Sequence, residues 1–159
     1  RAAFDAPVVD VTVVTGGHAT GVTAAARAYA ARIGAADRLV LVHAADHGEG
    51  LSASLRAGIA SLPANTAGVL VFLADMPSIP HFVAKALTEA MTPKHDAAAP
   101  VFEGRRGHPV LLGRTLFSAV NGVVAIGLEA KLIAVPPREL DRQIEGLVRL
   151  ACSGLPPSG

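Results

Sequence analysis

The chain has 159 residues, enough for one α/β domain with a hydrophobic core and too few for two. Its 14 Lys and Arg residues nearly balance 13 Asp and Glu residues, and aromatic residues are only 4% of the sequence. We therefore expect no nucleic-acid partner, because polyanion binding needs a basic field and base stacking needs aromatic side chains. The longest strongly apolar run, residues 69–74, is about a third of a membrane helix, which excludes a membrane protein.

Cysteine content and the N-terminal sequence point to a reducing compartment. Cys152 is the only cysteine, so no internal disulfide can form, and no secretory signal segment opens the sequence. We therefore expect a cytoplasmic protein with a single domain over residues 1–159. Charged residues are only 17%, below the roughly 25% of typical soluble domains, and the sequence begins with Arg1.

The chain alternates predicted strands and helices. The expected elements of the first half are a strand at residues 8–15, a helix with Val22, Ala25, Ala26, Tyr29 and Ile33 on its inner face, a strand at 39–43, and a helix over 51–62 capped by Ser52 or Ser54. A strand at 69–73 follows, and then a helix capped by Ser78 with Phe82, Val83, Ala86, Leu87 and Met91 on its inner face. Strands at 96–102 and 108–112 flank a turn at 104–107. The last expected elements are a short helix at 114–120, a strand at 131–135 and a helical tail at 137–150. This alternation predicts an α/β fold, a Rossmann-like three-layer α/β/α domain with a mainly parallel sheet.

Asp75 is the first candidate site residue. Ligands of such folds bind at the carboxyl ends of the strands, which here are Gly16, the residues after His43, and Asp75. A carboxylate at this position can hold Mg²⁺, a hard ion that prefers oxygen ligands. The alternative, equally favoured by the sequence, is that Asp75 only begins the turn before Met76 and Pro77.

A second candidate segment, residues 48–58, joins a glycine-bearing turn to a helix that carries Ser52, Ser54 and Arg56. The N-terminus of a helix offers free N–H groups to an anion or a base carbonyl. The commoner alternative is a plain capped helix with a solvated Arg56. The segment lacks the lysine of a phosphate-binding P-loop, so by itself it indicates a ligand only weakly.

A third candidate segment, residues 104–109, places Arg105, Arg106 and His108 between two glycines. Guanidinium groups in such a loop suit phosphate or carboxylate. The alternative, favoured when the segment is taken alone, is a β-hairpin turn with solvated arginines.

Three further patterns match known motifs poorly. Residues 16–21 have His18 where a dinucleotide-binding fingerprint needs glycine. His43 and His47 have the spacing of a zinc protease, but they follow a strand and the intervening acid is misplaced. Cys152 has no activating partner nearby in the sequence, so it is not expected to act as a nucleophile.

Four elements, in this order, resemble the MobA-like nucleotidyltransferases, and in particular the branch of molybdenum cofactor cytidylyltransferases. They are residues 13–16, residues 49–58, the segment Leu-Ala-Asp-Met-Pro at 73–77, and Pro100 followed by residues 104–112. The resemblance covers about residues 8–120, and the Ala-Asp-Met-Pro and Gly-His-Pro-Val elements are its more specific parts. It implies a domain of the nucleotide-diphospho-sugar transferase type.

The resemblance also implies an activity, a metal ion and site residues. The reaction would move CMP (or GMP) from CTP (or GTP) to the phosphate of molybdenum cofactor, a molybdopterin-type substrate, and release pyrophosphate. A molybdoenzyme or its chaperone would be a further partner. Asp75 would bind Mg²⁺ and act in catalysis, Gly50, Ser52 and Ser54 would join Asp75 in binding the nucleotide, and Arg105, Gly107 and His108 would face the pterin phosphate.

Departures from the family pattern leave alternatives open. The family's phosphate loop, which bears Arg and Lys, has no counterpart before Val8, and no acid stands at residues 121–123 or 136–137. We expect the protein to have further residues before Arg1 and near 121–124 and 136–137, which would also account for the low charge. The alternatives are a non-catalytic nucleotide-binding or degenerate transferase domain, and a nucleotidyltransferase that acts on another phosphorylated acceptor such as a sugar phosphate.

Overall fold

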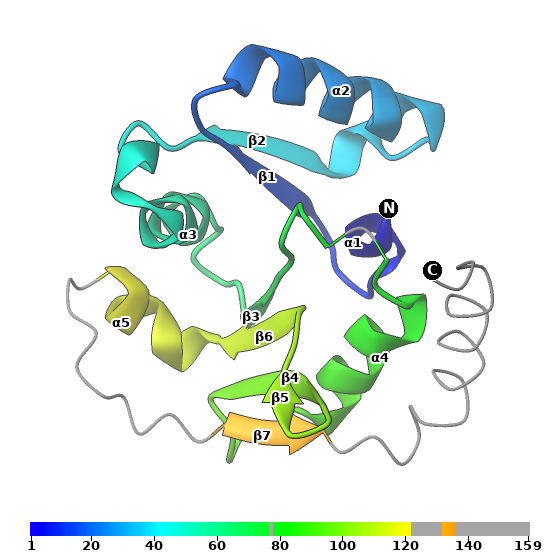
Figure 1. The fold of residues 1–159 in the computed structure, drawn as a ribbon, viewed down its shortest axis with the longest axis vertical. Coiled ribbons are helices and arrows are strands. Elements are labelled where there is room, and N and C mark those ends of the chain that lie inside the picture. Colours follow the sequence, from blue (N-terminus) through cyan, green and yellow to red (C-terminus); the bar gives the residue numbers. More distant parts are fainter. Residues whose placement is uncertain (77, 122–131, 136–159) are drawn as a thin grey trace, which may run out of the picture.

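A computed structural model describes residues 1–76, 78–121 and 132–135, and it contains the predicted alternation of strands and helices (Figure 1). In chain order the elements are α1 (Ala2–Asp5), β1 (Val11–Thr15), α2 (Ala19–Arg32), η1 (Ala36–Arg38), β2 (Leu39–His43), η2 (His47–Glu49), α3 (Leu51–Ala60), β3 (Gly68–Val71), α4 (His81–Ala90), β4 (Ala97–Phe102), β5 (Arg105–Arg106), β6 (Val110–Gly113), η3 (Arg114–Leu116), α5 (Phe117–Asn121) and β7 (Leu132–Val135). The predicted tail helix at 137–150, Cys152 and residues 122–124 and 136–137 lie outside the described residues.

The strands form a parallel pair and a mixed sheet. β1 pairs in parallel with β2, from Val11 opposite Leu39 to Thr15 opposite His43. The second sheet has the order β3-β6-β4-β5, with β7 parallel to β4 and the other pairings antiparallel. The α/β class is confirmed, but the prediction of a mainly parallel sheet is wrong for this second sheet. The links from β4 through β5 to β6 are too short for the crossover that parallel strands need.

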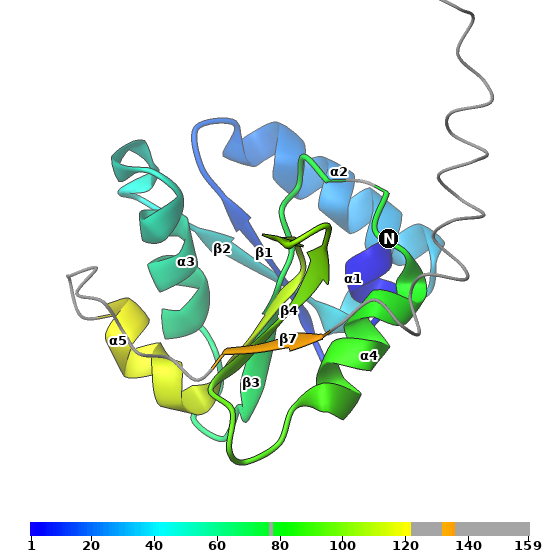
Figure 2. The same ribbon diagram turned by 60° about the horizontal axis from the view of Figure 1, so that its bottom comes forward.

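Helices lie on both sides of the strands. Figure 2 shows α3 and α5 on one side of the second sheet and α4 on the other. Val83 and Leu87 of α4 form a buried cluster with Ala98 of β4 and Leu111 of β6, as the apolar spacing of α4 predicts. The buried core that these four residues form therefore lies between α4 and the second sheet.

The inner face of α2 differs from the prediction. Val22 and Ile33 are exposed to 43% and 42%, whereas Ala30 is fully buried. Ala26 and Tyr29 of the predicted face are half-buried, so the buried side of α2 includes residues 26, 29 and 30 and leaves Val22 and Ile33 exposed. Among the described residues, no helix has the length and apolar character to cross a membrane.

Two predicted helix caps are also wrong. α3 begins at Leu51 with Gly50 as its N-cap residue, so Ser52 and Ser54 lie inside the helix and do not cap it. α4 has Pro80 at its N-cap position, and Ser78 lies outside the helix. In both cases a residue with a suitable backbone conformation, rather than a side-chain oxygen, precedes the helix.

Candidate functional site

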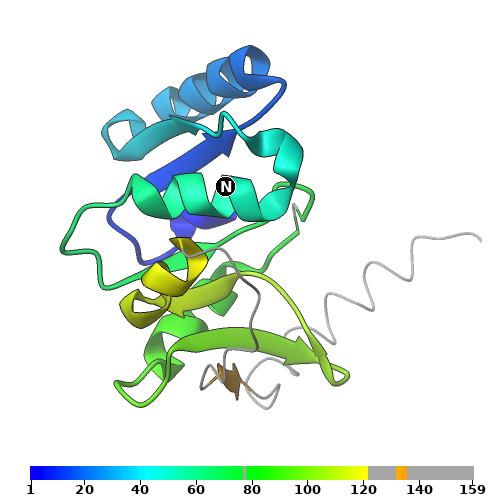
Figure 3. The same cartoon turned by 90° about the vertical axis from the view of Figure 1, so that its left-hand side faces the viewer.

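The predicted ligand-binding ends of the strands lie on one side of the molecule. Figure 3 shows the ends of β1 and β2, the N-terminus of α3, the turn after β3 and the β4–β5 hairpin on this common side. We call it the carboxyl edge. The turn before α3, the turn after β3 and the β4–β5 hairpin, which are far apart in the sequence, therefore lie on the same side of the molecule.

Asp75 lies in an exposed turn at this edge. The turn is closed by the Met76 N–H, which donates to the Leu73 carbonyl oxygen at 3.2 Å. Asp75 is exposed, and its carboxylate makes no hydrogen bond or ion pair with another described residue. Asp75 thus does form the turn that the alternative interpretation expects, while its carboxylate is still available to a ligand. Pro77, the last residue of the motif, lies outside the described residues.

His108 lies beside the strand that leads to Asp75. Its Nδ1 is 3.5 Å from the carbonyl oxygen of Val71, the last residue of β3. The neighbouring Gly107 N–H donates to the Pro100 carbonyl oxygen at 2.9 Å, which ties the loop to β4. The structure therefore brings the predicted acceptor-side loop close to the β3 end of the site.

Arg105 is a strand residue rather than a turn residue. Glu103 and Gly104 form the turn, with φ of 48° and 74°, and Phe102 pairs with Arg105 across it. Two successive positive φ values are typical of the tight turns that join hairpin strands. Arg105 and Arg106 are exposed, and neither forms an ion pair with a described residue. The hairpin alternative is therefore correct for the backbone, and the guanidinium groups remain open to a ligand.

The start of α3 is shaped by Gly50. Its φ of 106° and ψ of −169° lie in a region that side-chain-bearing residues rarely adopt. Ser52 is exposed and Ser54 is half-buried, and neither hydroxyl makes a hydrogen bond within the described part of the chain. Neither hydroxyl is used for capping, and Ser52, in the first turn of α3, is the more exposed of the two.

Arg56 has a role that the sequence does not reveal. Its Nη2 lies 3.0 Å from Glu49 Oε2 and 3.3 Å from Asp46 Oδ2. The expectation of a solvated Arg56 is therefore wrong, since its side chain is only 26% exposed and ties residues 46–49 to α3. Asp46 and Glu49 belong to the 3-10 turn η2 and its N-cap, outside α3, so the spacing along one α-helix could not have predicted the pairing.

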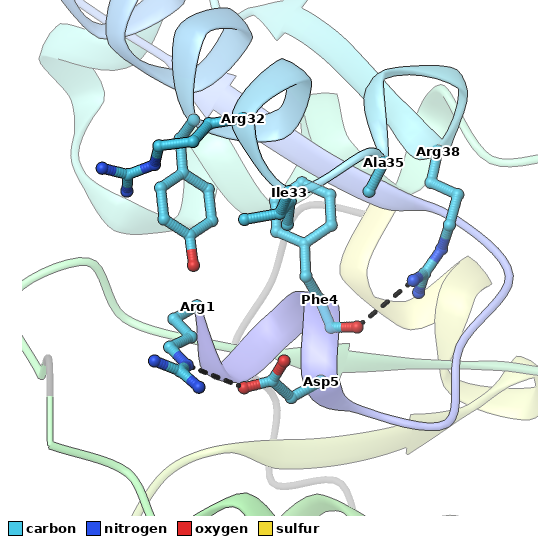
Figure 4. A pocket seen from close by; sticks show the side chains of 8 residues that line it. Arg1, Phe4, Asp5, Arg32, Ile33, Ala35 and Arg38 are labelled. Carbon is cyan, nitrogen blue, oxygen red and sulfur yellow. Dashed lines mark hydrogen bonds and ion pairs between the residues drawn. The ribbon is translucent and has the colours of Figure 1, made fainter.

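A separate pocket of about 460 Å³ lies at the opposite end of the β1–β2 pair (Figure 4). Arg32 lies over the Tyr29 ring at 5.0 Å, and Phe4 contacts the same ring at a centroid distance of 6.0 Å. Arg38 donates to the carbonyl oxygens of Phe4, Val8 and Val9. The sequence alone does not predict this pocket. The role visible for Arg38 is structural, since it attaches the segment before β1 to the start of β2.

The donor set at the carboxyl edge is compatible with a hard divalent ion. Within the described ranges, no three His, Cys, Asp or Glu side chains gather closely enough to enclose a metal ion. Mg²⁺ does not need such a cage, because it commonly uses one or two carboxylates together with substrate phosphates and water. The exposed carboxylate of Asp75, which has no partner among the described side chains, fits that pattern.

Comparison with solved structures shows the fold. Rv0371c from Mycobacterium tuberculosis H37Rv matches with a TM-score of 0.65 and 22% identity over 84% of this chain and 69% of its own. Its complex with manganese matches with a TM-score of 0.63, 21% identity, and coverage of 84% and 72%. An Rv0371c homolog from Mycobacterium sp. strain JC1 matches with a TM-score of 0.58, 19% identity, and coverage of 94% and 82%. No curated protein matches the chain.

Family membership is shown by the sequence itself. The family model of the MobA-like NTP transferase domain matches residues 1–139. This match confirms that residues 8–120 resemble the MobA-like nucleotidyltransferases, and it supports nucleotidyltransferase activity. The chain belongs to the MobA-like NTP transferase domain family.

Proposed function

We propose that the protein is a Mg²⁺-dependent nucleotidyltransferase that moves CMP (or GMP) from CTP (or GTP) to the phosphate of molybdenum cofactor. A phosphate oxygen of the acceptor attacks the α-phosphorus of the nucleotide and forms a new P–O–P linkage. The bond between the α-phosphorus and the bridging oxygen breaks, and pyrophosphate leaves. The main support is that the turn after β3, which contains the exposed Asp75, lies on the same side of a MobA-like domain as the N-terminus of α3 and the β4–β5 hairpin.

The proposed roles follow from the position of each segment. Asp75 would hold Mg²⁺, which neutralises phosphate charge when bound. Gly50, Ser52 and Ser54 would contact the nucleotide, because a helix N-terminus offers N–H groups and these two hydroxyls make no hydrogen bond within the described residues.

The acceptor would lie on the other side of Asp75. Arg105, Gly107 and His108 would contact its phosphate, with Arg105 as a fork-shaped donor to phosphate oxygens. A protein nucleophile is not required, so the chain's contribution is to position two substrates and balance their charge. The manganese complex of Rv0371c supports a divalent ion in a protein of the same fold.

A pyrophosphate-release assay tests the proposal. The full-length protein is incubated with MgCl₂, molybdenum cofactor and either CTP or GTP, and competition between the nucleotides identifies the donor. Release only when both substrates are present supports the proposal. Release with a sugar phosphate in place of the cofactor would assign another acceptor. Nucleotide binding without release from any mixture would identify a non-catalytic binding domain.

A further inference from the structure

A second pocket, of about 560 Å³, lies where β1 and β2 end. It is lined by residues 16–21, which include His18, and by His43 and His47. His43 is the last residue of β2 and His47 begins η2, so a short loop brings both imidazoles to the same pocket. Their ring centroids are 5.9 Å apart, with the ring planes inclined at 53°.

The His47 ring is held with one nitrogen free. Its Nδ1 lies 2.9 Å from the carbonyl oxygen of Ala44. A carbonyl oxygen can only accept a hydrogen bond, so Nδ1 carries the proton and a neutral ring keeps a lone pair on Nε2. The ring packs against Gly16 and Gly17, where a Cβ would lie 3.0 Å and 3.4 Å from its nearest atoms. Because Gly16 and Gly17 have no side chains, the His47 imidazole can occupy this position.

His43 also has a hydrogen-bonding partner at its Nδ1. The Thr15 hydroxyl donates to the Val42 carbonyl oxygen at 3.2 Å, so its oxygen can accept from the His43 Nδ1 at 3.5 Å. Thr15 is buried at 4% exposure, which makes it a fixed partner. In the tautomer with the proton on Nδ1, His43 also keeps its lone pair on Nε2. Two neighbouring imidazoles with anchored Nδ1 atoms and free Nε2 atoms are a typical arrangement of metal ligands.

We propose that His43 and His47 form a binding site for a transition-metal ion such as Zn²⁺. Imidazole nitrogens suit Zn²⁺, Cu²⁺ and Ni²⁺, whereas Mg²⁺ prefers oxygen. With metal–nitrogen distances of about 2.0–2.1 Å, two rings on one tetrahedral ion have centroids about 5–6 Å apart, which matches this pair.

The site supplies two protein ligands, which leaves the other positions to water or to oxygens of a bound ligand. It goes beyond the proposed function and does not depend on it. Because two imidazoles hold an ion less firmly than a closed four-ligand site, we expect exchangeable binding in the micromolar range.

The test is a calorimetric titration of the tag-free, full-length protein with ZnCl₂. We expect one ion to bind, and His43→Gln and His47→Gln each to lower the affinity at least tenfold. His95→Gln is the matched control, because His95 also has its Nδ1 against a hydroxyl, at 2.9 Å from Thr92 Oγ1. It should leave the affinity unchanged, and MgCl₂ should not compete.

A second measurement does not depend on variants. In ¹⁵N spectra of the wild-type imidazoles, Zn²⁺ should shift the Nε2 resonances of His43 and His47, because these atoms carry the free lone pairs. Equal Zn²⁺ affinity in wild type and in both glutamine variants would overturn the proposal. A shift at other histidines, with none at His43 and His47, would overturn it as well.

Discussion

His108 Nδ1 lies 3.5 Å from the carbonyl oxygen of Val71, a contact between two sequence motifs that are 37 residues apart. The same two segments continue into the β3–β6 pairing, where Val71 lies opposite Val110. One sheet therefore positions both the turn that carries Asp75 and the loop that carries His108. This arrangement places the proposed metal-binding carboxylate and the proposed acceptor-side loop beside the same strand.

Replacing Asp75 with Asn should abolish most of the activity and spare the fold. The change removes one charge and keeps the shape, and turnover should fall about 100- to 1000-fold, as when a charge-stabilising group is lost. Because Asp75 is exposed, the free energy of unfolding should change by no more than about 0.5 kcal/mol. Steady-state pyrophosphate release and urea denaturation measure the two effects.

Asp37→Asn is the matched control for this experiment. Asp37 is also exposed, but it lies in η1, before the start of β2 and away from the carboxyl edge. It should keep wild-type turnover. Full activity of the Asp75 variant would remove Asp75 from the proposed mechanism.

Replacing Gly50 with Ala should weaken nucleotide binding. At a φ of 106° a Cβ strains the backbone, which costs about 1–3 kcal/mol or forces the start of α3 to move. We expect a higher KM for the nucleotide and a lower melting temperature. Gly48→Ala is the control, since Gly48 has no positive φ and nothing within 4 Å of its Cβ position. Equal KM values for the two variants would show that the conformation of Gly50 is irrelevant to binding.

Replacing Arg56 with Gln should loosen the segment that precedes α3. The guanidinium pairs with Asp46 and Glu49, two largely exposed acids, so the loss of stability should stay below about 1 kcal/mol and shrink in high salt. The KM for the nucleotide should rise, because residues 46–49 lead directly into Gly50. Lys85→Gln removes an exposed pair with Glu89 on α4 and should leave KM unchanged. A KM that responds equally to both variants would contradict the role given to Arg56.

The positions of the strands along the chain could be predicted well, because runs of β-branched and apolar residues are local signals. β2 has the predicted bounds, and β1, β3 and β4 lie within or overlap the predicted runs. The antiparallel direction of β4 and β6 agrees with the hairpin alternative for residues 104–109, whereas the pairing of β3 with β6 joins segments far apart in the chain and has no local signal. The burial of Ala30 in place of Val22 likewise depends on how closely α2 approaches the sheet.

The candidate site was predictable in part for the same reason. The exposed turn at Asp75 and the glycine before α3 follow from the end of a strand and the start of a helix. The pairing of Arg56 with Glu49 and the contact of His108 with Val71 join segments through the tertiary fold. The orientation of His47 depends on a main-chain carbonyl, which has no signature in the sequence.

Replacing Leu87 with Ala tests the packing that supports the β3 end of the site. Leu87 is 1% exposed and packs with Val83, Ala98 and Leu111 between α4 and the second sheet. Truncation leaves a cavity that close-packed neighbours fill only partly, so the free energy of unfolding should fall by about 2–5 kcal/mol. Urea denaturation measures this loss, and Val9→Ala, at an 84% exposed position, should change stability by less than about 0.5 kcal/mol. A loss below about 1 kcal/mol for Leu87→Ala would mean that α4 does not hold the second sheet, and with it the turn at Asp75, in place.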